Sequence, residues 1–367
     1  MAAGGTGGHM FPGSIVAEEL VKRGHRVALI TDHRGASFDQ LFKGLDKKII
    51  RAGNLSGSLV ARFKSLFSIV VGWWQARSFL TKQKADVVVG FGGYPAFPAM
   101  LAARISGRPF CLHEQNAVMG RVNKAMAPKA KAIATSFEGT QNIPADAVSK
   151  VHLIGNPVRA AFREIENQDQ KNKETFSILV VGGSQGARIL SDIVPEAVAA
   201  LNKQDQQILN ITQQCRPEDA VRVEARYKAL NIDAQCPAFI DDMPMAFAAA
   251  DIIIARAGAL TVSEVAAAGK AAIFVPLAIA VDNHQYYNAE ALKKIGGAII
   301  VEEKDFNKDA LASEMSALMK DRKIIQQMAK ASKQADKSKA IENLADIILD
   351  VAQQHNHTSK NNKRVAV

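Results

Sequence analysis

The chain has 367 residues, of which 48% are hydrophobic and 22% charged, and it carries a formal net charge of +10. This length suits two domains and the apolar content suits two packed cores, which argues against a disordered chain. The three cysteines are odd in number and lack C-x-x-C spacing, which argues against a disulfide framework and a zinc cluster. We find no signal peptide and no apolar run near the roughly 18 to 20 residues that cross a bilayer, so we expect a cytoplasmic protein.

The positive charge is concentrated in the first half of the chain. Residues 1–155 contain 20 Lys and Arg against 9 Asp and Glu, whereas residues 156–367 contain 26 against 27. This asymmetry favours an acidic partner for the first half, either nucleic acid, anionic lipid headgroups or a phosphorylated substrate. Charge alone does not choose among these three partners.

Each half of the chain contains one glycine-rich turn. The first, GGTGGH, occupies residues 4–9, and the second, GGSQGAR, occupies residues 182–188 after an apolar run. A helix start presents unpaired N–H groups and glycine lets the backbone approach an anion, so both turns suit phosphate. Neither has the dinucleotide spacing G-x-G-x-x-G or the Gly-Lys-Ser/Thr ending of a P-loop. Either turn alone is equally well explained as helix-on-sheet packing, but the pair indicates a nucleotide diphosphate held between two domains.

The segment 59–80 contains both tryptophans, Trp73 and Trp74, with basic residues at 62, 64 and 77 around its apolar stretch. Indole rings and basic side chains favour the headgroup level of a membrane, which indicates an interfacial segment. A helical apolar stripe is also typical of a core helix. Both interpretations hold if they concern different faces of one helix.

Short apolar runs alternate with helical stretches along the chain. They predict buried parallel strands at 27–31, 87–91, 110–113, 132–135, 178–182, 208–212, 238–240, 252–255, 272–275 and 298–301. This alternation predicts an α/β fold with two doubly wound parallel sheets, and the default ligand site is a cleft between the halves. We expect an N-terminal domain at 1–155 and a C-terminal domain at 156–335. A helix at 336–352 that packs back on the first domain and a disordered basic tail at 353–367 would complete the chain.

Eight short blocks occur in the order found in the MurG family of bacterial glycosyltransferases (family 28), which the chain resembles. They are GGTGGH at 4–9, GFGGYP at 90–95, HEQN at 113–116, GNPVR at 155–159, GGSQGAR at 182–188, FIDDM at 239–243, GALTVSE at 258–264 and DNHQ at 282–285. The resemblance implies a GT-B fold, in which two Rossmann-like domains face a central cleft. It also implies inverting transfer of N-acetylglucosamine from UDP-N-acetylglucosamine to the C4 hydroxyl of MurNAc in undecaprenyl-pyrophosphoryl-MurNAc-pentapeptide (lipid I), which gives lipid II for peptidoglycan.

The resemblance also assigns the substrates to the two domains. The C-terminal domain would hold UDP-N-acetylglucosamine through Ser184, Ile240, Ala259, Leu260, Thr261, Val262, Ser263, Glu264 and Gln285. The N-terminal domain would hold lipid I at the cytoplasmic face of the inner membrane as a peripheral protein, against an anionic surface and not against nucleic acid. The residues that would complete the site from the other side are Thr6, Gly7, Gly8, Asn116 and Arg159.

The resemblance implies that Ile240 would meet uracil through its backbone and that Gln285 would bind the sugar. The chemistry of two other side chains agrees with the roles implied for them. A carboxylate such as Glu264 suits a ribose diol, and Arg159 can screen the charge that develops on departing UDP. No Asp-x-Asp occurs, so we expect neither a metal nor a cofactor.

An inverting transfer needs a general base for the acceptor hydroxyl, and two residues qualify. His9 lies on the first glycine turn and has a suitable ordinary pKa, although it also suits a helix-start contact with diphosphate. Glu114 follows a predicted strand, where active sites of open α/β sheets gather, although it also suits a structural ion pair. The residue types alone do not choose between them.

Two departures from the family pattern stand out. Only Met1-Ala2-Ala3 precedes the first glycine turn, where the family has a hydrophobic strand, so we expect a truncated or late start. Arg256 stands where the family commonly has serine, and we expect little effect. A UDP-sugar epimerase of the same fold, another acceptor, an NAD-dependent dehydrogenase and a nucleic-acid-binding module are the alternatives. The dehydrogenase lacks its fingerprint and the nucleic-acid module lacks its motif.

Overall fold

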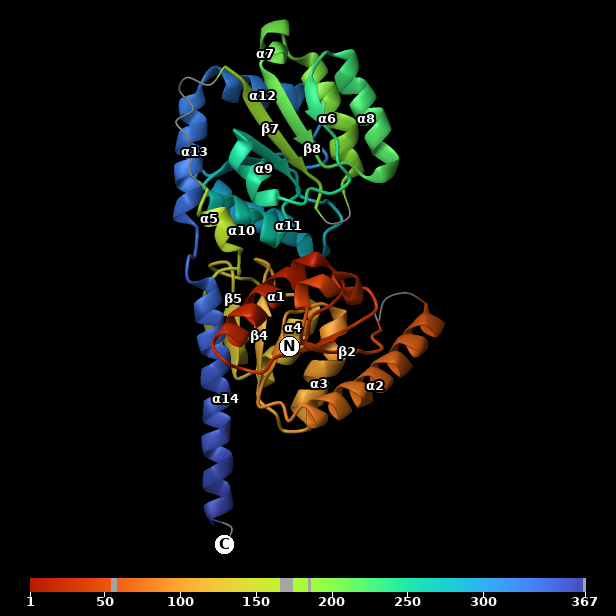
Figure 1. Cartoon of the computed structure of the whole chain (residues 1–367), viewed down its shortest axis with the longest axis vertical. Coiled ribbons are helices and arrows are strands. Elements are labelled where there is room, and N and C mark those ends of the chain that lie inside the picture. The colour runs from red at the N-terminus through yellow and green to blue at the C-terminus, as the bar shows by residue number, and fades with distance from the viewer. Residues whose placement is uncertain (54–57, 166–173, 184–185, 366–367) are drawn as a thin grey trace. The chain divides into compact units, whose positions relative to one another are not determined.

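The structure is a computed structural model that describes residues 1–53, 58–165, 174–183 and 186–365 (Figure 1). The chain forms two compact units. Unit 1 contains Met1–Val158 together with Lys339–Val367, and unit 2 contains Arg159–Ser338. The change of unit at Val158 lies within the GNPVR block at which we placed the domain boundary.

Unit 1 is built from short strands, each followed by a helical segment. Its main elements are α1 (Gly7–Lys22), β1 (Ala28–Thr31), β2 (Asp46–Ile49), α2 (Leu59–Lys82), β3 (Val88–Gly90), α3 (Phe97–Ile105), β4 (Phe110–Glu114), α4 (Arg121–Met126), β5 (Ala132–Thr135), β6 (Val151–Leu153) and α14 (Ala340–Val365). The strands pair in parallel as β1-β2 and as β3-β4-β5-β6. Every side chain of β4 and β5 is buried, as expected for strands covered on both faces.

Residues 1–3 lie where the expected first strand would pair. Ala2 forms parallel bridges to both Ile30 of β1 and Gly90 of β3, and its N–H donates to the Val89 carbonyl at 2.7 Å. Ala2 and Ala3 are fully buried. This short segment therefore connects the two groups of strands in unit 1.

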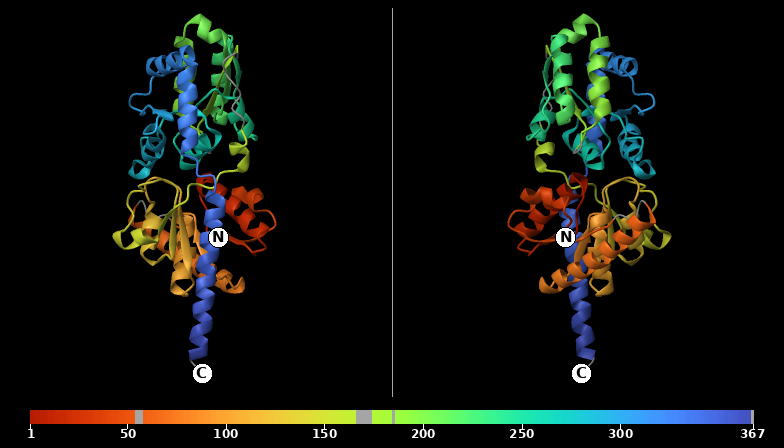
Figure 2. Two further views of the ribbon diagram at one scale, coloured as in Figure 1. Left: turned by 90° about the vertical axis from the view of Figure 1, so that its left-hand side faces the viewer. Right: turned by 90° about the vertical axis from the view of Figure 1, so that its right-hand side faces the viewer.

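The helix α14 packs against α1 in unit 1 (Figure 2). Its Leu344, Ala345 and Ile348 join the same buried cluster as residues of α1 and β1. Arg23 of α1 also forms an ion pair with Asp346 at 2.5 Å. The helix continues through Val365, where we predicted a disordered tail from 353. A polar composition indicates weak packing, but a helix already docked at its first half can extend at low cost.

Unit 2 contains one six-stranded parallel sheet with the order β12-β11-β10-β7-β8-β9. Its elements are α5 (Ala160–Arg163), β7 (Phe176–Val181), α6 (Arg188–Ala200), α7 (Lys203–Gln207), β8 (Leu209–Gln213), α8 (Pro217–Ala229), β9 (Asp233–Gln235), α9 (Met243–Ala249), β10 (Ile252–Ala255), α10 (Ala259–Ala268), β11 (Ala271–Phe274), α11 (His284–Lys293), β12 (Ala298–Ile300), α12 (Lys308–Lys320) and α13 (Arg322–Gln334). The central strands β7 and β10 pair in register from Ile252 with Ile178 to Ala255 with Val181. Both units therefore have the predicted Rossmann-like α/β architecture.

One predicted strand is wrong. Residues 238–240 form a loop, and the edge strand β9 lies earlier, at Asp233–Gln235. Phe239 in that loop is 65% exposed. An apolar run therefore marks a surface loop here, while the true edge strand is polar because an edge strand needs only one buried face.

Candidate functional site

The first glycine turn of unit 1 is fixed by the carboxylate of Asp32, which follows β1. Asp32 Oδ1 accepts from the N–H of Gly5 at 3.1 Å and from the N–H of Gly35 at 2.9 Å. Gly5 has a φ of +86°, and a Cβ at Gly4 would lie 2.7 Å from the same carboxylate oxygen. Glycine is therefore required at both positions, because a side chain would break the turn that leads into α1.

The turn ends where α1 begins, so Thr6, Gly7 and Gly8 lie at the start of a 16-residue helix. Thr6 is the N-cap residue, in extended conformation, and its side chain makes no capping hydrogen bond. The first N–H groups of a helix have no partner within it, and they add to the positive end of the helix dipole. This end of unit 1 therefore suits a phosphate group, as we predicted from the glycine pattern.

His9 occupies the first turn of α1 and is half-buried. Its Nδ1 lies 3.2 Å from Oε1 of Gln115, which follows β4. The turn after β3 passes against the opposite side of the ring: a Cβ at Gly93 would lie 3.2 Å from Nε2 of His9. Gly92 and Gly93 have φ values of +78° and +73°, so this turn needs glycine both for its backbone and for the space that the imidazole occupies.

Glu114, the last residue of β4, is 2% exposed and has hydrogen bonds on both carboxylate oxygens. Oε1 accepts from the N–H of Asn116 at 3.0 Å, and Oε2 accepts from the N–H of Gly120 at 2.9 Å and from Nδ2 of Asn123 at 2.8 Å. The carboxylate thus holds the loop that carries Asn116. Of the two candidate bases, Glu114 is the one enclosed by structural donors.

Sequence reasoning missed the side chains that support His9. Gln115 lies between two residues that we had singled out, and Asn156 lies in the GNPVR block, yet neither was assigned a role. The structure brings both together: Nδ2 of Asn156 donates to the carbonyl of Gln115 at 3.1 Å. The HEQN block was the signal that could have revealed Gln115, because this residue lies between Glu114 and Asn116 at the carboxyl end of the same strand.

In unit 2, the predicted donor residues 259–264 form the first part of α10, after the N-cap residue Gly258. Ala259 and Val262 are buried, so they can meet a ligand chiefly through their backbone, whereas Leu260 and Thr261 are half-buried. The hydroxyl of Ser263 donates to the Ala259 carbonyl at 2.9 Å, within the helix itself. The start of α10 therefore presents backbone N–H groups next to small side chains, which suits an anion.

Glu264 is the one carboxylate of this helix segment. Burial raises its pKa to about 8, and the nearby positive charge of Arg159 opposes that rise. Arg159 is the N-cap residue of α5, and its guanidinium carbon lies 5.1 Å from the centre of the Phe162 ring. Arg159, which we had grouped with the residues that complete the site from the other side, thus belongs to unit 2 and interacts electrostatically with Glu264.

The second glycine turn has close backbone packing. A Cβ at Gly182 would lie 2.5 Å from the Ala187 nitrogen, and one at Gly186 would lie 2.4 Å from Cγ of Arg216. Gly183 and Gly186 also have positive φ values. The turn therefore requires glycine at these positions, and it leads into α6 as predicted. Ser184 lies outside the described residues.

Gln285 and Ile240 come from two other loops of unit 2. Gln285 lies in the first turn of α11, and its Oε1 accepts from the N–H of Leu277 at 3.0 Å. The preceding residues Asp282 and Asn283 both have a φ of +52°, a conformation that is uncommon for residues other than glycine. Ile240 is half-buried in the loop after β9.

Arg256, where the family commonly has serine, follows β10 and is well packed. Its Nη1 donates to the carbonyls of Val275 at 3.0 Å and Pro276 at 3.3 Å, and its Nη2 pairs with Glu303. Glu303 in turn accepts from the N–H of Ala278 at 3.1 Å. The expectation that arginine in place of serine has little effect on function stays untested. Arg256 nevertheless holds the loop in which the N–H of Leu277 donates to Gln285.

The helix α2 in unit 1 has two different faces. Trp73, Ala76 and Leu80 pack into a buried cluster with α3, as expected for a core helix. On the other side, Phe63 is 73%, Phe67 63% and Trp74 68% exposed, with Leu66 and Val70 between them. These five residues, 63, 66, 67, 70 and 74, follow helical spacing, and we call them the α2 apolar face. Arg62, Lys64 and Arg77 are exposed around it.

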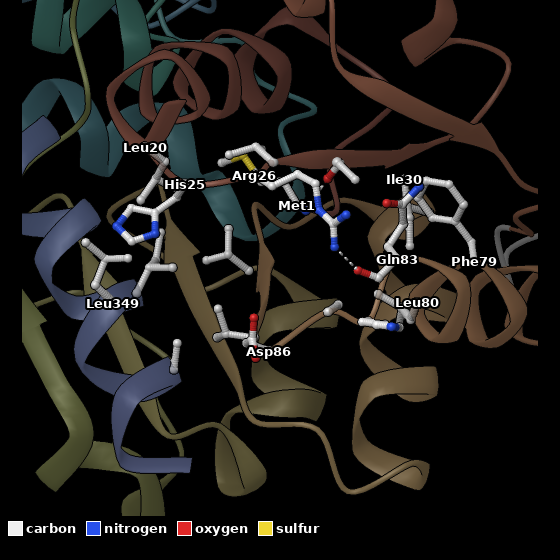
Figure 3. Close-up of a pocket in the computed structure, with 18 residues that line it drawn as sticks. Met1, Leu20, His25, Arg26, Ile30, Phe79, Leu80, Gln83, Asp86 and Leu349 are labelled. Carbon is white, nitrogen blue, oxygen red and sulfur yellow. Dashed lines mark hydrogen bonds between the residues drawn. The ribbon is translucent and has the colours of Figure 1, made fainter. Parts of the chain in front are cut away.

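A cavity of about 230 Å³ lies near the amino ends of β1 and β3, with Met1, Arg26 and Asp86 among its lining residues (Figure 3). It is lined by the starts of β1 and β3 and by residues of α2 and α14, and Arg26 donates to the Gln83 carbonyl across it at 2.7 Å. Ligands of open α/β sheets bind at the carboxyl ends of the strands. This cavity, at their amino ends, is therefore not part of the candidate site.

In the described ranges of the chain, no group of three or more His, Cys, Asp or Glu side chains is placed to hold a metal ion. Among the described helices, none combines the length and apolar character that crossing a membrane requires.

Comparison with known proteins identifies the family. Residues 1–135 match the glycosyltransferase family 28 N-terminal domain, and residues 177–344 match the family 28 C-terminal domain. The UDP-N-acetylglucosamine–N-acetylmuramyl-(pentapeptide) pyrophosphoryl-undecaprenol N-acetylglucosamine transferase of Zymomonas mobilis is 40% identical over 351 residues, which cover 95% of this chain and 91% of that protein.

Solved structures agree with this result. The crystal structure of MurG from Acinetobacter baumannii has a TM-score of 0.77 and 35% identity, and it covers 95% of this chain and 98% of its own. The structure of a UDP-N-acetylglucosamine 2-epimerase from Neisseria meningitidis has a TM-score of 0.67 at 14% identity, covering 95% of this chain and 98% of its own, and shows only that the fold is shared. The chain therefore has the GT-B fold and belongs to the MurG family, within glycosyltransferase family 28.

Proposed function

We propose that this protein transfers N-acetylglucosamine from UDP-N-acetylglucosamine to the C4 hydroxyl of MurNAc in lipid I, with inversion, to give lipid II. The observation that carries this proposal is 40% identity, over 95% of the chain, to a transferase named for this reaction. The site residues of both units are compatible with it. A UDP-sugar epimerase is disfavoured, because likeness to the epimerase is limited to the fold.

Unit 2 is proposed to hold the donor. The start of α10 and the second glycine turn offer backbone N–H groups for the diphosphate, and the Ile240 backbone would meet uracil. Glu264 would bind the ribose hydroxyls, since a carboxyl group in either protonation state can bond a diol. Gln285 would bind the sugar, and Arg159 would stabilise the charge on departing UDP.

Unit 1 is proposed to hold the acceptor and the base. The N–H groups of Gly7 and Gly8, together with the hydroxyl of Thr6, would bind the lipid-linked diphosphate, and the loop at Asn116 would face the same ligand. His9 is the better base, because an imidazole at the edge of this turn can take a proton, whereas the carboxylate of Glu114 is enclosed by the donors of its own loop.

The proposed reaction is a single displacement. The acceptor O4 attacks C1 of N-acetylglucosamine while the bond from C1 to the UDP oxygen breaks, and the electron pair of that bond leaves with UDP. Nε2 of His9 takes the proton of the O4 hydroxyl. Glu114 acts as a positioning residue, because it orders the loop from which Gln115 reaches His9.

Peripheral contact with the anionic cytoplasmic face of the inner membrane is the last part of the proposal. The α2 apolar face exposes three aromatic side chains within a basic surround, a pattern that favours the headgroup level of a membrane. Lipid I is anchored in that membrane by its undecaprenyl chain. A surface helix of this kind would bring unit 1 to its acceptor.

The test is mass-spectrometric detection of lipid II from a soluble lipid I analogue and UDP-N-acetylglucosamine, with the chain as it stands. Formation of lipid II together with stoichiometric UDP supports the proposal. Conversion of the donor without any acceptor would instead indicate an epimerase. Binding of UDP-N-acetylglucosamine with no reaction in the presence of the analogue would indicate a transferase with a different acceptor.

A further inference from the structure

A chain of hydrogen bonds connects His9 to the buried interior of unit 1. Gln115 bridges two histidines: its Oε1 lies 3.2 Å from Nδ1 of His9, and its Nε2 lies 3.0 Å from Nδ1 of His113. Beyond His113, Nε2 of that ring lies 3.4 Å from the hydroxyl of Ser136. His113 is fully buried on β4, while His9 is half-buried at the glycine turn.

The contacts of Ser136, at the buried end of this series, determine which atom donates and which accepts in each bond. The Ser136 hydroxyl lies 2.8 Å from the Glu114 carbonyl and 2.8 Å from Oδ1 of Asn156, and both are acceptors. Its single hydrogen is therefore used there, so it can only accept from His113. Nε2 of His113 must then carry a hydrogen and donate to Ser136.

The protonation state of His113 determines the donors and acceptors in the bonds toward Gln115 and His9. Burial lowers the pKa of His113 to about 4, against a smaller opposing effect of a hydrogen bond to the Gly155 backbone, so the ring is neutral near pH 7. With its hydrogen on Nε2, a neutral ring accepts at Nδ1. The amide NH₂ of Gln115 therefore faces His113, and its Oε1 faces His9. An amide oxygen only accepts, so Nδ1 of His9 must be the protonated nitrogen.

We propose that Gln115 and His113 are positioning residues that keep the hydrogen of neutral His9 on Nδ1, so that its Nε2 carries the lone pair that takes the acceptor proton. The arrangement of the bonds is independent of the reaction, but its value for catalysis rests on the proposed function.

The other titratable groups around these bonds are Glu114 at the end of β4, Asp32 after β1 and Tyr94 after β3. Asp32 and Tyr94 bond each other at 3.3 Å.

The first test measures the tautomer of His9 directly. Nitrogen-15 NMR of the protein labelled at histidine, above the pKa of His9, separates the protonated ring nitrogen from the bare one, and a His9→Gln spectrum assigns the signals. We expect hydrogen on Nδ1 of His9 and on Nε2 of His113. Hydrogen on Nε2 of His9 in the parent protein would overturn the proposal, and this outcome requires neither a positioning variant nor an active enzyme.

The second test removes the bridge. Gln115→Met keeps the side-chain length but removes both hydrogen bonds, so we expect the His9 tautomer to change and kcat to fall about 10- to 100-fold, with the KM for UDP-N-acetylglucosamine unchanged. The matched control is Gln141→Met, the same change at an exposed position of unit 1, which should leave both readouts as in the parent. An unchanged tautomer in Gln115→Met would contradict the proposal.

A conservative variant separates positioning from folding. Gln115→Glu still accepts from Nδ1 of His9, and its negative charge should raise the pKa of His9 and move the acid limb of the kcat profile to higher pH. We expect kcat above the optimum within about tenfold of the parent, since the hydrogen stays on Nδ1. If the NMR result holds but His9→Ala makes lipid II at the parent rate, the assignment of the base fails and the hydrogen-bond arrangement stands.

Discussion

The end of unit 1 that is proposed to bind the acceptor and the end of unit 2 that is proposed to bind the donor are built differently. At the carboxyl end of β4 in unit 1, buried side chains bond one another in series: Gln115, His113, Ser136 and Asn156 support a single imidazole. At the start of α10 in unit 2, the side chains are mostly small, and one carboxyl group, Glu264, has a raised pKa. The first end is organised by side chains and the second by backbone.

This difference matches what each end is proposed to do. Taking a proton in the transition state depends on the direction of one lone pair, so the base needs fixed neighbours. Holding a diphosphate depends on several N–H groups of a helix start, and it tolerates small changes in any one of them. Single substitutions should therefore affect catalysis more at the unit 1 end and donor binding more at the unit 2 end.

The largest effect is expected from His9→Ala. Loss of a general base costs about 10²- to 10⁴-fold in kcat, and we expect the KM for the donor to change little because the donor is proposed to bind unit 2. Steady-state kinetics with the soluble lipid I analogue measures both constants. His33→Ala, the same change at an exposed position of unit 1, is the control. A fall in kcat of less than tenfold would place the base elsewhere.

Glu114→Gln distinguishes support from catalysis at the same end. The amide keeps one oxygen but replaces the other with NH₂, which cannot accept from the two donors that face it, so we expect a decrease of about 2 to 3 kcal/mol in the free energy of unfolding of unit 1. Urea denaturation measures it. If Glu114 were the base instead, kcat would fall by the amount predicted for His9→Ala in addition to this loss of stability.

The α2 apolar face is expected to contribute about 1.5 to 3 kcal/mol of membrane affinity for each large side chain that it buries in lipid. Trp74→Ala should therefore weaken binding to liposomes containing anionic phospholipid at least tenfold in a flotation assay. Trp73→Ala is the matched comparison, because that ring packs into unit 1 and its loss should lower stability rather than lipid affinity. Equal liposome binding by Trp74→Ala and the parent would remove this face from the proposal.

Most of the fold could be predicted because each buried strand has an apolar run in its own local sequence. The runs that form β7 and β10 are continuous apolar segments, and they lie where expected. Three edge strands were missed because they carry no such run: β2 has the sequence DKKI, β6 the sequence VHL and β9 the sequence DAQ. The loop at 238–240 shows the converse, since Phe239 faces solvent for reasons that its local sequence does not express.

The candidate site could be predicted only in part, for a related reason. Glycine patterns reveal strand-to-helix turns because the backbone conformation is a local property, and both turns need glycine as expected. The support of His9 depends on Gln115, which is 106 residues away, and no spacing rule connects them. The two tryptophans are adjacent in sequence, yet only the helix's packing decides which one is exposed.

Glu264 should make the stability of unit 2 depend on pH. Its pKa is raised from 4.5 to about 8 by burial, so the folded protein holds a proton that the unfolded chain releases between these values. The free energy of unfolding should fall as pH rises through this window and level off above it. Each pKa unit is worth about 1.4 kcal/mol, so a loss of about 2 to 4 kcal/mol between pH 5 and pH 8 is expected.

Glu264→Gln is the matched variant for this dependence. The amide cannot ionise, so its stability should vary less with pH, and it should exceed that of the parent above about pH 8. Denaturant midpoints of both proteins at several pH values decide the question. Parallel pH profiles for the two proteins would show that another group is responsible.

The smallest effect is expected from Arg256→Ser, which restores the residue common in the family. The change removes hydrogen bonds to the Val275 and Pro276 carbonyls and the partner of Glu303, and should cost about 1 to 2 kcal/mol of stability. Because Gln285 bonds Leu277 of the same loop, we also expect a several-fold higher KM for the donor with kcat unchanged. The double variant Arg256→Ser with Glu303→Gln removes the unpaired charge and should recover part of the stability. A fall in kcat at constant KM would show that this loop acts on the reaction itself, and the backbone-organised end would then need as precise a geometry as the end that holds His9.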